Sequence, residues 1–248
     1  MKLLCDAHTH FVSEKDIEER LQHQIPSLVC NSTIDEITSF LERNLPSFFI
    51  PTCGVHPWSA DRMTVKEMEP FLRKVPVIGE IGMDHVWCDV PLDIQQKVFE
   101  EQLALACELK KPVILHTKGQ EKEIAAIIKN YPNRYLIHWY SCDHFLEDYI
   151  EQNCYFSIGP DVWWNPSTRN VARKVPSDRI LTETDGLNAV QWAYDEAPDD
   201  KKFLLPNIPL TTKNALELVI RTISSIRGIS EKDCSTITYK NLVQGFLK

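Results

Sequence analysis

Short runs of apolar and β-branched residues alternate along the chain with longer segments whose apolar residues recur at helical spacing. This alternation is typical of repeated βα units and predicts a parallel sheet wrapped by helices. We expect strands at residues 3–8, 27–31, 47–53, 77–80, 112–116, 135–138, 154–158 and 179–184. Eight strands in 248 residues predict a single domain, residues 1–248, of the α/β class, folded as a (β/α)8 TIM barrel.

Two of the helical segments have clear starting signals. Residues 33–44 begin with a capping box, and residues 91–109 begin with a proline in the first turn. Both are expected to pack on the outside of the barrel. Residues 194–209, rich in proline and acidic side chains, predict a long loop, which two terminal helices at 210–227 and 230–247 would follow.

The composition is that of an ordinary folded protein, with 43% hydrophobic and 25% charged residues. A net charge of −8 argues against a broad basic surface that grips duplex nucleic acid along its length. Asp6 breaks the first apolar run, and no stretch approaches the roughly 18 apolar residues of a membrane span, so neither a signal peptide nor membrane insertion is expected. The eight cysteines form no C-x-x-C pair, which favours reduced thiols in a cytoplasmic protein. We infer no obligate protein partner from the sequence.

The first chemical signal is the pair His8 and His10. In an extended strand, side chains two apart point to the same side, so Asp6, His8 and His10 share one face. Two imidazoles placed in this way can bind one zinc-like ion. Alone the pair is a weak signal, because a histidine pair with a purely structural role would be about as frequent.

Four further polar residues each close an otherwise apolar run. Glu80 ends VIGE, His116 ends PVILH, His138 ends YLIH and Asp185 ends RILTETD. A TIM barrel places its catalytic groups at the carboxyl ends of its strands, where residues far apart in sequence meet. Any one of the four could be a buried structural group or a solvated loop side chain, but their repeated position predicts that they meet at one mouth.

Four histidines and two carboxylates exceed the three protein ligands of one tetrahedral catalytic ion, so we predict two divalent metal ions. Zinc is the expected metal, with magnesium, manganese or nickel as alternatives, because availability often decides among them. Two close cations can activate a water for hydrolysis at phosphorus or carbonyl carbon. The predicted ligands are His8 and His10 on one ion, His116 and His138 on the other, Glu80 as the bridge, and Asp185 on the first ion or on the attacking water.

Several ordered motifs carry a resemblance that spans nearly the whole chain. They are DAHTH at the start, GVHPW at 54–58, GEIGMD at 79–84, the segment QQKVFEEQLALACELKKPVILH, IHWYS at 137–141, YFSIGP at 155–160, TETD at 182–185 and YKNLVQGF near the end. In these motifs the sequence resembles the TatD family of metal-dependent deoxyribonucleases, within the amidohydrolase superfamily. The resemblance implies a barrel with one or two divalent ions, hydrolysis of phosphodiester bonds in DNA, metal ligands at the positions above, and His56 facing the substrate.

The predicted function is therefore metal-dependent hydrolysis of a phosphodiester, with DNA or a small phosphodiester as substrate. Glu80, Asp185 and His56 are expected to act in catalysis: Glu80 holds the ions, Asp185 orients or deprotonates the water, and His56 contacts the phosphate. Two alternatives stay open. One is an amidohydrolase-type enzyme that cleaves an amide, ester or lactone, and the other is a non-catalytic metal-binding barrel.

Other positions bear on the substrate. Where family members commonly carry an arginine after the fifth-strand histidine, this chain has Thr117 and Lys118; lysine keeps the positive charge but loses the bidentate fork. Residues 186–189 also depart from the small residue, proline and tyrosine that often follow ETD in the family. Any single tryptophan would more often pack loops together, but the six as a group would form an aromatic rim for unpaired bases or for another flat organic substrate. These six, all shortly after predicted strands, are Trp58, Trp87, Trp139, Trp163, Trp164 and Trp192.

Overall fold

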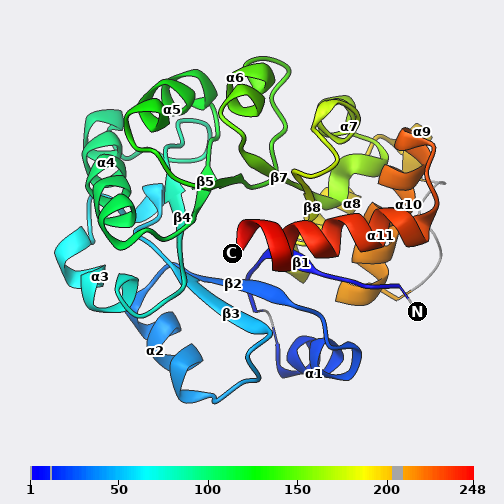
Figure 1. The fold of residues 1–248 in the computed structure, drawn as a ribbon, viewed down its shortest axis with the longest axis horizontal. Coiled ribbons are helices and arrows are strands. Elements are labelled where there is room, and N and C mark those ends of the chain that lie inside the picture. Colours follow the sequence, from blue (N-terminus) through cyan, green and yellow to red (C-terminus); the bar gives the residue numbers. More distant parts are fainter. Residues whose placement is uncertain (1, 12, 203–208) are drawn as a thin grey trace.

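The computed structural model describes residues 2–11, 13–202 and 209–248. Its strands form one eight-stranded sheet in sequential order, in which each strand pairs in parallel with the next (Figure 1). They are β1 Asp6–Thr9, β2 Ser27–Asn31, β3 Phe49–Cys53, β4 Val77–Gly82, β5 Val113–His116, β6 Tyr135–Ile137, β7 Tyr155–Ile158 and β8 Ile180–Thr182. All eight overlap the predicted runs, and the TIM-barrel fold is confirmed.

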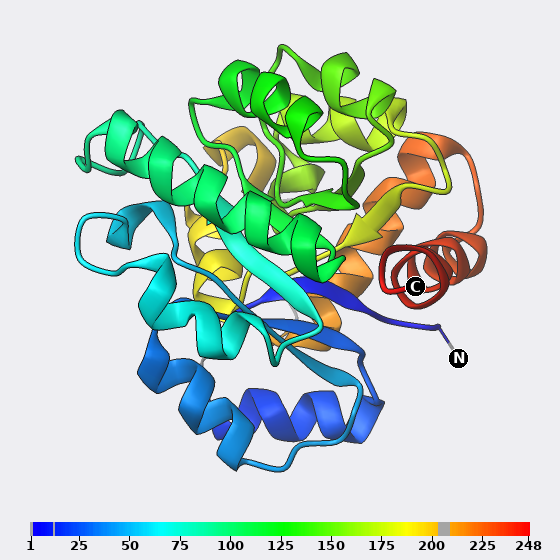
Figure 2. The same ribbon diagram turned by 60° about the vertical axis from the view of Figure 1, so that its left-hand side comes forward.

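Helices connect successive strands and lie around the outside of the ring (Figures 1 and 2). Those between strands are α1 Glu14–His23, α2 Ile34–Glu42, α3 Val65–Leu72, α4 Leu92–Leu109, α5 Glu121–Ile127, α6 Leu146–Glu151 and α7 Pro166–Lys174, with the 3-10 turns η1 Pro57–Ser59, η2 Ile128–Asn130 and η3 Pro160–Trp163. After β8 come α8 Leu187–Asp195, α9 Asp199–Lys202, α10 Thr212–Arg227, α11 Glu231–Lys240 and the π-helical segment η4 Asn241–Phe246. Among the described helices, none combines the length and the apolar character that crossing a membrane requires.

Local sequence explains where the predicted outer helices begin. The Thr33 hydroxyl accepts the backbone N–H of Glu36, and the Glu36 carboxylate accepts the backbone N–H of Thr33, which is the expected capping box of α2. Pro91 directly precedes α4, where its missing N–H costs nothing. Phe99 and Leu103 of α4 are buried in the main core between the helices and the sheet.

The predicted loop at 194–209 is wrong in part. Helix α8 continues to Asp195, and the short helix α9 follows after three residues. Pro198 precedes α9, and Asp199 and Asp200 fill its first turn. Proline and acidic side chains are favoured at helix starts as well as in loops, so composition alone did not separate the two. Residues 203–208 of this stretch lie outside the described residues.

A second buried cluster unites apolar residues from strands on every side of the ring, which can meet only in the barrel interior. Its members are Cys5, Ala7, Leu28, Val77, Ile114, Leu136, Tyr155, Leu181, Leu242 and Phe246. The last two belong to η4, whose segment reaches the middle of the ring in Figure 1 and closes the interior at the amino ends of the strands. Since side chains two apart on a strand share a face, His116 after Ile114 and His138 after Leu136 form the next interior layer.

The junction between β8 and β1 differs from the other seven. In the part of the chain that the structure describes, no ladder pairing joins these two strands. Instead, the Asp6 carboxylate accepts the backbone N–H of Thr184 at 2.9 Å and the Thr184 hydroxyl at 2.6 Å, and the Asp185 N–H donates to the His8 carbonyl at 3.0 Å. The fully buried Arg20 donates to the same Asp6 carboxylate at 2.9 Å. We call this junction of Asp6, His8, Thr184 and Asp185 the β1–β8 seam.

Candidate metal centre

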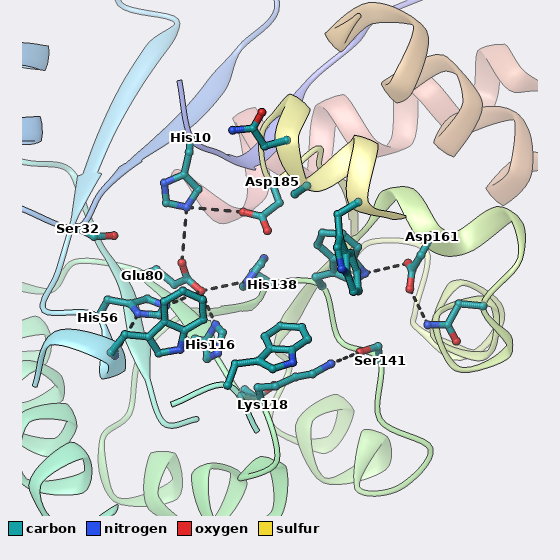
Figure 3. A pocket seen from close by; sticks show the side chains of 18 of the residues that line it. His10, Ser32, His56, Glu80, His116, Lys118, His138, Ser141, Asp161 and Asp185 are labelled. Carbon is teal, nitrogen blue, oxygen red and sulfur yellow. Dashed lines mark hydrogen bonds and ion pairs between the residues drawn. The ribbon is translucent and has the colours of Figure 1, made fainter. Parts of the chain in front are cut away.

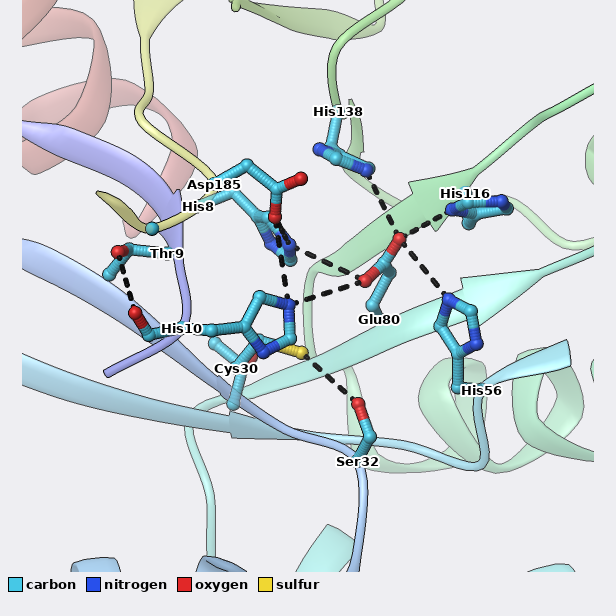
Figure 4. A network of polar contacts seen from close by, with 12 residues as sticks. His8, Thr9, His10, Cys30, Ser32, His56, Glu80, His116, His138 and Asp185 are labelled. Atoms are coloured by element: carbon cyan, nitrogen blue, oxygen red, sulfur yellow. Dashed lines mark hydrogen bonds and ion pairs between the residues drawn. The ribbon is translucent and has the colours of Figure 1, made fainter. Parts of the chain in front are cut away.

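The predicted ligands meet at the carboxyl ends of the strands, around the carboxylate of Glu80 (Figure 4). Its Oε2 lies 3.4 Å from Nε2 of His8 and 3.9 Å from Nε2 of His10. Its Oε1 lies 2.6 Å from Nδ1 of His116 and 3.1 Å from Nε2 of His138. The two oxygens of one carboxylate therefore face two different pairs of imidazoles, as a bridging ligand would.

Asp185 adds a second carboxylate on the seam side of this group. Its Oδ1 lies 3.3 Å from Nε2 of His8 and 3.6 Å from Nε2 of His10. The residue has a left-handed backbone, with φ of +57°, a conformation that aspartate adopts more readily than most residues. Asp185 and His10 are partly exposed, whereas His8 lies fully buried beneath them.

Two of these side chains enter the interior through irregularities in their strands. The register of β1 with β2 shifts around His8, and the register of β4 with β5 shifts around Glu80. Counting by twos from the interior residue Val77, regular alternation would turn Glu80 toward the helices. The irregularity brings its carboxylate to the centre of the cluster instead.

Two carboxylates that the sequence analysis did not single out hold the second pair of histidines. Asp84 Oδ2 lies 3.0 Å from Nε2 of His116, and Glu183 Oε2 lies 3.3 Å from Nδ1 of His138. With a ring N–H donated to each, the nitrogen that faces Glu80 keeps a lone pair for a cation. Asp84 ends the motif GEIGMD and Glu183 lies within TETD. Their place in these motifs, next to predicted ligands, is the sequence feature that could have identified them.

Asp84 is itself tightly held. Its carboxylate accepts the indole N–H of Trp58 at 2.8 Å and the backbone N–H groups of Val86 and Trp87 at 2.8 and 2.9 Å. Burial opposes its ionisation, but the hydrogen bonds from His116, Trp87 and Trp58 hold the pKa of Asp84 below its usual value. The His116 ring thus rests against a fixed, ionised partner.

Charges within the cluster compensate one another. Burial disfavours an ionised Glu80, but His138 and other imidazoles outweigh it and hold the pKa of Glu80 well below its usual value. Burial also opposes a charged His138, yet Glu80 and Glu183 raise the pKa of that ring well above its usual value. Burial and His138 lower the pKa of His8, but Glu80 and Asp185 outweigh both and raise it to about 9. The carboxylates thus hold protons where a divalent cation would supply positive charge, so cation binding would release protons.

The donor set fits divalent cations. Within the described part of the chain, neither ring nitrogen of the fully buried His8 makes a hydrogen bond, although its Nε2 lies near the carboxylates of Glu80 and Asp185. A buried polar group without a well-formed hydrogen bond costs free energy, which a cation bound to this ring would offset. Two sets of donor atoms, each within 4.8 Å of one another, come from His8, His138 and Asp185, and from His56, Glu80 and His116. Imidazole nitrogens with carboxylate oxygens suit zinc and similar ions.

His56 lies beside the bridging position, after β3. Its Nε2 is 3.5 Å from Glu80 Oε1, and its Nδ1 accepts the backbone N–H of Trp58 at 3.3 Å. Because Nδ1 is the acceptor, the neutral ring carries its proton on Nε2. Burial lowers the pKa of His56, which keeps the ring neutral at neutral pH. The ring can therefore donate one hydrogen bond from Nε2 into the pocket.

A cavity of about 640 Å³ opens above the cluster (Figure 3). Five of the six tryptophans line it: Trp58, Trp87, Trp139, Trp164 and Trp192. The expectation for Trp163 is wrong, because η3 packs against α10 and buries this ring against Leu218 and Ala197. The cavity thus combines a polar floor with an aromatic wall, which suits a ligand with a charged part and a flat part.

Lys118 brings a positive charge to the same cavity. Its Nζ lies 4.7 Å from the centre of the Trp87 ring and donates to the Ser141 hydroxyl at 3.1 Å. The lysine that replaces the family's usual arginine therefore faces the pocket rather than solvent alone. A cation here favours an anionic ligand.

Trp139 is fixed by contacts below the cavity. Its indole N–H donates to Asp161 at 2.9 Å, and burial raises the pKa of Asp161 to about 6. A side chain at Gly159 would meet this indole, since a Cβ there would lie 2.5 Å from the ring. The absence of a side chain at Gly159 is thus part of what lets Trp139 lie in the cavity wall.

Comparisons with known proteins identify the family. The family model for TatD related DNase matches residues 5–247. The chain is 29% identical over 206 residues to the metal-dependent hydrolase YabD of Bacillus subtilis, covering 74% of this chain and 80% of YabD. It is 31% identical over 172 residues to the 3'-5' ssDNA/RNA exonuclease TatD of a Rahnella strain, covering 63% of this chain and 64% of that protein.

Solved structures share the fold. The TatD homologue YjjV of Escherichia coli superposes with a TM-score of 0.75 at 21% identity, covering 98% of this chain and 97% of the other. A TatD family hydrolase from Entamoeba histolytica gives a TM-score of 0.75 at 16% identity, covering 99% and 98%. With the family model matched over nearly its whole length, the chain belongs to the TatD related DNase family of metal-dependent hydrolases.

Proposed function

We propose that this hydrolase cleaves phosphodiester bonds in nucleic-acid strands whose bases are unpaired, using two divalent ions bridged by Glu80. The observation that carries the proposal is the position of the Glu80 carboxylate, with one oxygen toward His8 and the other toward His116 and His138, beneath a tryptophan-lined cavity. The names of relatives that act on single-stranded DNA and RNA support the substrate class.

In the proposed reaction, Asp185, His56 and Lys118 have different roles beside the bound ions. Bound ions would lower the pKa of a water and offset the negative charge of the phosphate. Burial opposes ionisation of Asp185, but His8 and the other nearby imidazoles hold its pKa below its usual value, so the carboxylate is ionised and can accept the proton of the attacking water. His56 donates its Nε2 hydrogen bond to a phosphate oxygen. Lys118 attracts the anionic strand into the cavity.

The bridging role of Glu80 is tested by replacing it with an amide. Elemental analysis of wild type should give about two divalent ions per chain, as a two-metal site requires, and Glu80→Gln should bind far fewer. Hydrolysis should fall by roughly 100-fold, because the amide is a neutral and weaker ligand. Glu101→Gln, on the exposed face of α4, is the matched control. Unchanged metal content in Glu80→Gln would disprove the bridge.

Substrate comparison separates phosphodiester cleavage from the amidohydrolase alternative. Metal-loaded protein should hydrolyse a nitrophenyl phosphodiester and single-stranded oligonucleotides, because the ions and Lys118 favour a phosphate. Simple esters, amides and lactones should react more slowly. A faster reaction with any of these would favour the amidohydrolase reading, and no turnover with any substrate would favour the non-catalytic barrel.

Tryptophan fluorescence tests the aromatic wall. Binding of a short single-stranded oligonucleotide to the metal-loaded protein should change the emission, since bases stack on exposed indole rings. Trp87, Trp58 and Trp192, about half exposed at 53%, 45% and 45%, should contribute most. An occupied site with unchanged emission would exclude base stacking.

We also propose that zinc is the working metal and that the protein acts in the cytoplasm. Histidine-rich ligand sets favour zinc among the abundant divalent ions. All eight cysteines are free thiols in the structure, which suits a reducing compartment.

A further inference from the structure

One buried cysteine lies in the same interior layer as the metal-facing histidines. Leu28 of β2 belongs to the apolar interior cluster, and Cys30 lies two residues further along the same strand. Strand alternation therefore places Cys30 above Leu28 in the way that His116 lies above Ile114. Its side chain is 4% exposed, so it lies at the floor of the site and is shielded from solvent.

The sulfur of Cys30 lies among three donors from two other parts of the ring, the end of β1 and β4. One donor atom each of His8, His10, Cys30 and Glu80 all lie within 4.8 Å of one another. Figure 4 shows the Cys30 sulfur beside the ring of His10, on the side of the site that faces Ser32. Among the described side chains, the sulfur also meets the Ser32 hydroxyl at 3.9 Å, too long for a strong hydrogen bond. The thiol thus has a weak partner within the protein and strong metal donors beside it.

A second observation points to a ligand at this place. His8 is fully buried, and within the described residues neither of its ring nitrogens makes a hydrogen bond, although its Nε2 lies 3.3 Å from Asp185 Oδ1 and 3.4 Å from Glu80 Oε2. Zinc bonds to nitrogen and sulfur are about 2.0 to 2.3 Å long, so two tetrahedral ligands lie roughly 3.5 Å apart. Adjustments of about 1 Å would bring the four donors onto one cation.

We infer that Cys30 is a sulfur ligand, with His8, His10 and Glu80, of the divalent cation on the seam side of the site. This inference rests on the proposed two-metal centre and specifies one half of it. Thiolate is a soft ligand that favours zinc and related ions and disfavours magnesium and manganese. The two halves of the centre therefore differ: the seam-side position is selective for thiophilic ions, and the position between His116 and His138 accepts harder ones.

Cobalt substitution tests the inference without any substrate. Metal-free protein loaded with one equivalent of Co²⁺ should show an intense thiolate-to-cobalt charge-transfer band in the near ultraviolet. Cys30→Ser should lose this band. Cys53→Ser should keep it, because Cys53 is equally buried on the neighbouring strand β3 but packs in the core between sheet and helices. Cobalt bound to wild type with visible absorption but no such band would overturn the inference.

A second measurement needs no variant and so does not depend on how well Cys30→Ser folds. X-ray absorption of wild type with one equivalent of zinc should show a sulfur neighbour at about 2.3 Å. A shell of nitrogen and oxygen alone would overturn the inference. A protein that shows zinc–sulfur bonding but cleaves no phosphodiester would refute the proposed function and leave Cys30 as a ligand. A protein that cleaves phosphodiesters but shows no zinc–sulfur bonding would refute the Cys30 ligand and leave the proposed function.

Discussion

The two sides of the metal centre are supported by different kinds of bonds. Glu80 and His116 lie on β4 and β5, which are joined by parallel strand pairing that continues through Gly82 and His116. His8 and Asp185 lie at the β1–β8 seam, where the described residues show one backbone hydrogen bond between them and a set of side-chain bonds centred on Asp6. One half of the site therefore depends on the sheet, and the other depends on a few buried polar side chains.

This difference explains why the first motif of the chain contains more than metal ligands. Asp6 lies on β1 with His8, and His10 directly follows that strand, but Asp6 contacts Arg20 and Thr184 rather than the cluster around Glu80. Its place in DAHTH reflects the closure of the barrel. The predicted ligand His8 and the barrel-closing Asp6 thus lie two residues apart on the same strand.

The largest effect is expected from removing the buried arginine of the seam. Arg20→Met leaves the carboxylates of Asp6 and Asp16 buried without their cation, which should lower the free energy of unfolding by about 3 to 5 kcal/mol. Arg43→Met, which removes an exposed pair with Glu14, should cost at most about 1 kcal/mol. Urea unfolding of the metal-free proteins measures both. Equal losses of unfolding free energy would show that the buried contacts of Arg20 stabilise the fold no more than an exposed ion pair does.

A smaller effect is expected on the sheet side. Asp84→Asn and Glu183→Gln replace by neutral amides the carboxylates that hold His116 and His138. Affinity for the ion between these rings should therefore fall about 10- to 100-fold. The ion at His8 should remain, which would leave about one ion per chain after dialysis at low free zinc. Metal analysis beside the control Glu101→Gln checks this. Loss of both ions together would show that the two halves are not separable.

The smallest expected effect is a difference in stability between substitutions at two buried threonines. Thr184→Val removes the hydroxyl that donates to Asp6 and accepts the backbone N–H of Gly186, and should destabilise the fold by about 2 kcal/mol. The Thr52 hydroxyl, on β3 within the paired sheet, is buried and has no partner among the described residues, so Thr52→Val should be neutral or slightly stabilising. Thermal and urea unfolding measure the pair. If Thr184→Val is as harmless as Thr52→Val, the seam does not depend on this hydroxyl.

The barrel and the meeting of the six predicted ligands followed from the sequence because both depend on short-range patterns. His116 and His138 extend the alternation of regular strands, so their direction could be inferred by counting. Glu80 could be inferred only from its place at the end of an apolar run, since the register shift in β4 reverses the count. Cys30 was not singled out, although it lies two residues after the interior residue Leu28.

Other features depend on contacts that no local pattern contains. Trp163 follows a strand like the other tryptophans, and only the packing of η3 against α10 decides that it turns inward. Helix α9 has the composition of a loop. Arg20 lies on α1 among charged residues that read as an exposed surface, yet it reaches across to Asp6, Thr9 and Thr212. These outcomes are set by tertiary packing and became visible only in the folded chain.

The position of η4 has a consequence for how a newly made chain folds. Leu242 and Phe246 complete the apolar layer at the base of the ring, but they are synthesised after all eight strands and after α10 and α11. A nascent chain that has emerged only as far as β8 still exposes the apolar side chains at the amino ends of its strands. Final consolidation of that layer must therefore wait until the ribosome has released the segment that seals it.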